Sequence, residues 1–132
     1  IAAYMQVTEA ALASQGSADA IAVAKRLTAA RVALLEVVDF VVQQTRSNPN
    51  AVFAGSVPYL MLAGNVVAGW QMARSLLAAQ EQSGKGIDVD FMKAKVITAR
   101  FYADHLLTKA PGMRDSIVEG ADSVNELALA AF

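Results

Sequence analysis

The chain has 132 residues, enough for one domain with a real hydrophobic core but not for two. Hydrophobic residues make up 55% of it and charged residues 17%, against roughly 45–50% and about 25% in an average soluble domain. This excess indicates a chain that packs against something else. The net charge is −1 and there is no cysteine. These values exclude a basic field for nucleic acid or an anionic membrane, and they exclude disulfides and cysteine-based zinc sites.

The N-terminal residues already follow a helical pattern. The spacing predicts a helix over residues 1–14, ended by the glycine at position 16, with one stripe formed by Ile1, Met5, Thr8 and Leu12. We therefore expect an upstream region, with residues 1–17 as the tail of a preceding helix and residues 18–132 as the bundle, within a single domain over 1–132. No basic segment precedes an apolar run, so no signal peptide is visible and we expect a cytoplasmic protein.

A second helix is predicted over residues 18–46. Apolar residues recur along it at four-three spacing, which is typical of a bundle seam; they are Val23, Leu27, Ala30, Leu34, Val37 and Val41. The polar run at residues 47–50 ends this helix, and residues 51–56 form an apolar connector.

The third helix is predicted to begin near Pro58 and to reach residue 82, followed by a turn at 83–86. Its first half, up to Trp70, is apolar nearly all round, which indicates the central helix. Four small residues would let neighbouring backbones approach closely: Ala63, Gly64, Ala68 and Gly69.

Residues 51–70 are about long enough to cross a bilayer. They contain polar residues, a proline and three glycines, so we favour a helix buried in a bundle.

A fourth helix is predicted over residues 89–109, with Asp88 as its N-cap. Its stripe consists of Met92, Val96, Ala99, Ala103 and Leu106. The segment 110–112 interrupts the pattern, and a short helix over 113–120 and a turn within 122–130 follow. Long helices joined by short turns predict an all-α fold, an up-and-down four-helix bundle with short extra terminal helices.

His105 is the only histidine, and its surroundings do not suggest a metal site. The residues one turn away from it are Phe101, Tyr102, Thr108 and Lys109, none of which is a usual zinc ligand. A phosphorelay histidine on a bundle is conceivable. We favour a packed or surface histidine near the end of a helix, where it suits the helix dipole.

The other candidate chemistry also has a simpler interpretation. Glu36 and Asp39 share a face with glutamine and arginine, so we expect a solvated or interdomain surface. The segment 83–86 resembles a phosphate loop only superficially, because the preceding strand and the full spacing are missing. The aromatic residues fall at helical spacing among aliphatic ones and indicate core or interface. We therefore assign no catalytic, cofactor-binding or metal-binding residue.

Three segments carry a resemblance to a known family. They are VPYLMLAGNVVAGW at residues 57–70, KVITARFYADHLL at 95–107 and GADSV at 120–124. Together they resemble the C-terminal helical domain of bacterial acyl-CoA dehydrogenases, over roughly residues 18–132. The run ARFYADH is the most specific part.

The resemblance implies a parent enzyme that removes two hydrogens from an acyl-CoA thioester. In that family a glutamate takes the α-proton, FAD accepts the hydride, and an electron-transferring flavoprotein accepts the electrons. The glutamate belongs to a Tyr-Glu-Gly-Thr-type segment that is missing here, since Glu119 and Gly120 are followed by Ala121. We expect a non-catalytic structural or assembly domain without its own cofactor. Its partners would be the dehydrogenase body and a further subunit of a homo-oligomer, with no nucleic acid and no membrane. The alternatives are a stand-alone four-helix interaction or phosphorelay module and a membrane-associated bundle.

Overall fold

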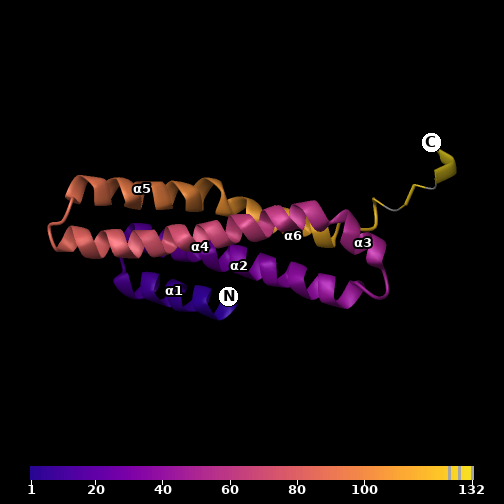
Figure 1. Ribbon diagram of the computed structural model, residues 1–132, viewed down its shortest axis with the longest axis horizontal. Helices are drawn as coiled ribbons and strands as arrows, with labels where there is room; N and C mark the ends of the chain where they lie inside the picture. The colour runs from indigo at the N-terminus through magenta and orange to yellow at the C-terminus, as the bar shows by residue number, and fades with distance from the viewer. Residues whose placement is uncertain (125, 128, 132) are drawn as a thin grey trace.

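The fold consists of helices and connecting turns. A computed structural model describes residues 1–124, 126–127 and 129–131 (Figure 1). Its elements are α1 (Ala2–Gln15), α2 (Ala18–Gln44), α3 (Pro49–Ala54), α4 (Ser56–Gly84), α5 (Val89–His105), η1 (Leu107–Lys109), α6 (Ala110–Val118) and η2 (Leu129–Ala131). The described residues contain no strand. The predicted all-α helical bundle is confirmed.

The long helices α1, α2, α4 and α5 run up and down along one axis (Figure 1). Helices α2 and α4 contact each other, α1 packs on both of them, and α5 and α6 pack on both of them as well. Because α1 has 14 residues and α2 has 27, α1 accompanies only part of α2. The bundle therefore has four long helices near the α1–α2 turn, whereas at the other end the long helices α2 and α4 are joined by the short helix α6.

Local signals explain where several helices begin and end. Gly16 adopts φ 76°, a left-handed conformation that glycine takes without steric cost, and it terminates α1. Ser17 then caps α2 by accepting a hydrogen bond from the backbone N–H of Ala20 at 3.1 Å. Asn48 caps α3 in the same way at Ala51. Asp88 lies at the N-cap position of α5, but its side chain makes no capping hydrogen bond.

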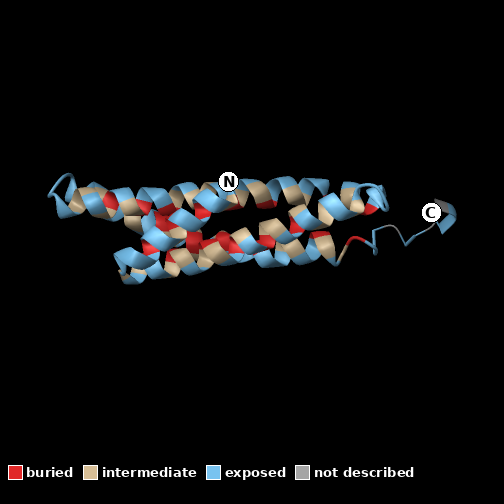
Figure 2. Cartoon of the chain, turned by 90° about the horizontal axis from the view of Figure 1, so that it is seen from below, coloured by how far each residue is buried: buried red, intermediate tan, exposed pale blue. Residues whose placement is uncertain are grey.

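The core follows the predicted stripes closely in α1 and α2. Met5, Thr8 and Leu12 are buried in α1, and Val23, Leu27, Ala30 and Val37 are buried in α2. Figure 2 shows the buried residues on the sides of the helices that face one another. Alanine supplies half of the buried hydrophobic positions among the described residues: Ala20, Ala30, Ala33, Ala51, Ala73, Ala79, Ala99, Ala103, Ala110 and Ala121.

Several predicted boundaries differ from the structure. The apolar connector at 51–56 is largely helical, because Pro49 and the Asn48 cap start α3 ahead of it. The segment 110–112 begins α6 instead of interrupting a helix, since Pro111 lies in the first turn, where its missing N–H costs nothing.

Helix α5 ends at His105, four residues before the predicted end at residue 109. The tighter turn η1 follows and shifts the helical phase. Leu107 is therefore buried, whereas Leu106 of the predicted stripe is half-buried. Part of the turn predicted within 122–130 lies outside the described residues.

The prediction that the first half of the third helix is central was only partly right. Leu62, Val66 and Gly69 of α4 are buried, but Leu60 and Met61 are 73% and 62% exposed. Gly64 is exposed and nothing would lie within 4 Å of a Cβ atom added there, so it does not serve a close approach. Over the described part of the chain, none of the helices is both long and apolar enough to cross a membrane.

Candidate functional site

His105 lies at the last residue of α5 and is exposed. Its ring packs on that of Phe101, with the centroids 4.4 Å apart and the planes inclined by 33°. Among the described residues, no group of three or more histidine, cysteine, aspartate or glutamate side chains could hold a metal ion. His105 is thus a surface histidine with an aromatic neighbour.

The acidic residues of α2 belong to a surface ion-pair cluster. Arg114 of α6 donates to Glu36 at 2.5 Å, to Asp115 at 2.9 Å and to Glu119 at 2.6 Å. These three carboxylates, Asp115 first, raise the pKa of Arg114, so it stays charged. Glu36 is therefore occupied in holding α6 against α2. Asp39 is exposed on the same helix.

The segment at 83–86 completes α4 and turns toward α5. Gly86 has φ 77°, a conformation that favours glycine at a turn. Lys85 pairs with Glu81 at 2.6 Å, one helical turn earlier, and both side chains are more than half exposed. This arrangement is a plain helix–helix connection in which the lysine already has a partner.

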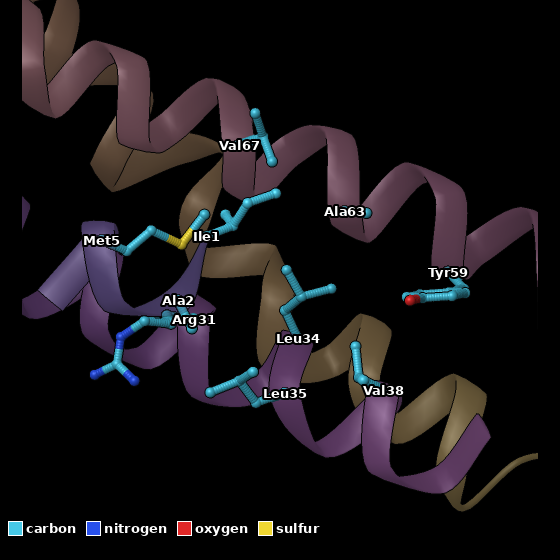
Figure 3. Close-up of a pocket in the computed structure, with 10 residues that line it drawn as sticks. All are labelled: Ile1, Ala2, Met5, Arg31, Leu34, Leu35, Val38, Tyr59, Ala63 and Val67. Atoms are coloured by element: carbon cyan, nitrogen blue, oxygen red, sulfur yellow. The ribbon is translucent and has the colours of Figure 1, made fainter. Parts of the chain in front are cut away.

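An apolar groove opens between α2 and α4 where α1 begins (Figure 3). Its volume is about 260 Å³. The side chains and backbone that line it are those of Ile1, Ala2, Met5, Arg31, Leu34, Leu35, Val38, Tyr59, Ala63 and Val67. Figure 3 shows α1 at one end of the groove, with Leu34, Val38, Tyr59 and Ala63 continuing beyond Ile1.

The one charged residue lining the groove is already paired. Arg31 donates from Nε and Nη2 to the two carboxylate oxygens of Glu9 at 2.7 and 3.0 Å, and the two side chains are only 11% and 12% exposed. The hydrogen bond from Arg31 to Glu9 raises the pKa of the guanidinium. A groove without a free cation does not fit the pyrophosphate of FAD, so we assign no flavin to it.

A polar clasp joins α4 to the end of α5. The Tyr102 hydroxyl donates to Asn65 Oδ1 at 2.9 Å, and Asn65 Nδ2 donates to the carbonyl of Leu106 at 2.9 Å. Burial raises the pKa of Tyr102, which keeps its hydroxyl protonated and able to donate. The clasp satisfies a carbonyl at the point where α5 ends and η1 begins, so it fixes the position of that break.

Trp70 forms the corresponding contact between α4 and α1. Its Nε1 donates to Thr8 Oγ1 at 2.8 Å, and the Thr8 hydroxyl donates to the carbonyl of Tyr4 at 3.2 Å. The guanidinium of Arg74 lies 5.5 Å from the centre of the Trp70 ring. The indole is therefore part of the packing between helices, as the aromatic spacing predicted.

Comparison with known proteins identifies the family. Residues 1–128 match the family model described as "acetyl-CoA dehydrogenase C-terminal like". The chain belongs to this family. The resemblance on residues 57–70, 95–107 and 120–124 is thereby confirmed, and the match also includes the residues of α1.

Two curated relatives of this acetyl-CoA dehydrogenase C-terminal-like chain are dehydrogenases. It is 39% identical over 111 residues to 3-methylmercaptopropionyl-CoA dehydrogenase of Ruegeria pomeroyi, covering 84% of this chain and 19% of the relative. It is 31% identical over 93 residues to the broad-specificity linear acyl-CoA dehydrogenase FadE5 of Mycobacterium tuberculosis, covering 68% of this chain and 15% of that relative. The chain thus spans less than a fifth of either. No solved structure matches.

Sequence reasoning missed the groove and the clasp in this C-terminal-like domain. The signal for the groove was present, because Leu35 and Val38 widen the apolar face of α2 beyond a two-helix seam. The clasp had a weaker signal. Asn65 is a polar residue within an otherwise apolar helix, and such a residue requires hydrogen-bonding partners when it is buried.

Proposed function

We propose that this chain is the C-terminal structural domain of an FAD-dependent acyl-CoA dehydrogenase. In this proposal it contributes to packing on the dehydrogenase body, or on another subunit of a homo-oligomer, and not to the chemical step. Flavin, acyl-CoA and the catalytic glutamate would belong to the rest of the full-length protein. Family membership and the two dehydrogenase relatives support this proposal.

The apolar surface of the domain is the observation that carries the proposal. Val57, Leu60 and Met61 are all well exposed near the start of α4, where they make a contiguous face at helical spacing. Tyr4 and Val7 of α1 and three residues of α5 are exposed as well, the latter being Phe91, Ile97 and Phe101. Exposed apolar patches of this kind mark contact surfaces between proteins.

The decisive experiment changes this face in the full-length enzyme. We expect the double variant Leu60→Glu/Met61→Glu to alter the oligomer mass or to cause aggregation, because two charges would enter a desolvated contact. The control is Gln71→Glu/Ser75→Glu, at exposed polar positions of the same helix. Mass by light scattering and acyl-CoA oxidation per bound FAD are measured together.

The outcomes separate assembly from catalysis. The proposal expects an altered mass in the first variant only, with turnover per bound FAD retained in whatever enzyme stays assembled. A first variant with the wild-type mass and solubility would contradict the assembly role. A full-length protein that binds no FAD would contradict the dehydrogenase assignment itself.

A further inference from the structure

The groove lies where the bundle changes from four helices to three. Figure 1 shows the N-terminus about midway along the bundle, beside α2 and α4. Beyond that point α2 continues from Leu34 to Gln44 and α4 extends back toward Ser56. From Ile1 toward Gln15, α1 packs beside α2 and α4. In the opposite direction from Ile1, the groove takes the place of α1 beside the same two helices.

The apolar stripe of α1 points into this groove. Met5, Thr8 and Leu12 are buried, but Ile1, the next member of the stripe, is 74% exposed although it lines the groove. Leu34 and Tyr59 also line it and pack against the core from the side. The stripe of α1 therefore leads from Met5 to Ile1 and into the groove, whose apolar lining is not covered by another helix.

We propose that the groove receives the segment immediately upstream of Ile1 in the full-length protein, as a helical continuation of α1. This inference rests on the proposed function, in which the domain follows a dehydrogenase body. The curated relatives are several times longer than this chain. Beyond Ile1 the groove is lined along α2 from Leu34 to Val38, which corresponds to about five residues, or ~7.5 Å at 1.5 Å per helical residue.

The chemistry of the groove favours an apolar helix face as its occupant. Arg31 is neutralised by Glu9, and the remaining lining residues are aliphatic or aromatic.

A covalently attached segment also has an advantage over a second copy of the chain. It is always next to the groove, and a short tether gives an effective concentration in the millimolar range. It would enter along the axis of α1, which is the direction in which the groove runs (Figure 3). The segment should carry an apolar residue three or four residues before Ile1, and no proline there.

The test uses hydrogen exchange of the full-length protein. In the wild type, the roughly five residues before Ile1 should be protected as a helix. Ala63→Phe fills the groove from its α4 wall and should raise their exchange rates at least about tenfold. The matched control is Gly64→Phe, one residue along the same helix, at an exposed position where an added Cβ atom has nothing within 4 Å. It should leave that exchange unchanged.

Each outcome decides one statement. Unprotected upstream residues in the wild type, or residues that stay equally protected in Ala63→Phe, would overturn the groove proposal. Protection of Leu34 and Val38 that grows with protein concentration would identify a second copy as the occupant and would also overturn it. The proposed function is judged separately, by FAD content and acyl-CoA oxidation of the same sample. An active flavoprotein with a freely exchanging upstream segment would refute this inference alone.

Discussion

The contact between Gly69 and Leu107 allows a sharp test of the packing. Gly69 is buried in α4, and the Leu107 side chain of η1 lies directly over it. A Cβ atom at position 69 would stand 2.5 Å from Leu107 Cδ2 and 2.8 Å from Cδ1 and Cγ. Leu107 is itself buried in the core cluster, so it has little room to move away. We therefore expect Gly69→Ala to destabilise the bundle.

The magnitude follows from two opposing effects. Alanine is favoured over glycine inside a helix by about 1 kcal/mol, whereas forcing an extra carbon into a packed core costs about 1–3 kcal/mol. The variant Gly64→Ala, in open space on the same helix, isolates the first effect. The helix-propensity gain cancels between the two variants, so Gly69→Ala should be less stable than Gly64→Ala by about 1–3 kcal/mol.

The assay is urea unfolding of both variants, followed by helical circular dichroism. Fluorescence is less suitable here, because Trp70 adjoins the substituted position. Equal free energies of unfolding for the two variants would refute the argument. So would a Gly69→Ala protein more stable than the wild type, since it would mean that Leu107 moves aside at no cost.

Two further predictions concern charged groups. Glu9→Ala leaves Arg31 without its acceptor in a largely buried site, so it should lower the free energy of unfolding in urea by about 1.5–3 kcal/mol. Glu81→Ala, at an exposed pair, should not change the unfolding midpoint. The hydrogen bond from Arg100 lowers the pKa of Asp104. The ionised carboxylate therefore stabilises the folded state above about pH 4, the pKa of an unperturbed aspartate. This contribution is lost as the pH falls through the folded-state pKa of Asp104. Asp104→Asn should therefore lose less stability on acidification than the wild type, and a parallel loss in both proteins would contradict the assignment.

The sequence contained enough information to predict the helices and the inner face of α2. Val23, Leu27, Ala30 and Val37 follow the four-three spacing and are buried, because each of them faces another helix. Leu34 obeys the same spacing but is only half-buried, since it lies where α1 no longer covers α2. Periodicity identifies the face that a helix turns inward, but it does not reveal how far the neighbouring helix extends.

Other features depend on contacts between distant residues. Gly64 and Gly69 both lie in the same apolar run, and only the position of Leu107 shows that an added Cβ atom would be too close at Gly69. The apolar run at 57–70 does not distinguish a buried face from an exposed contact face, because both are made of the same residue types. The first turn of α6 was predictable in principle, since proline is common there, although Gly112 obscured the helical pattern.

The many alanines in the core affect how the domain responds to temperature. A methyl group uncovers little apolar surface when the chain unfolds, and such surface adds about 0.45 cal/K/mol to the heat capacity for each Å² exposed. A core in which alanine occupies positions such as Ala30, Ala73 and Ala103 therefore gives a smaller heat-capacity change than one filled with leucine. The curve of stability against temperature becomes flatter, and the stability of the bundle changes less over a given range of temperature.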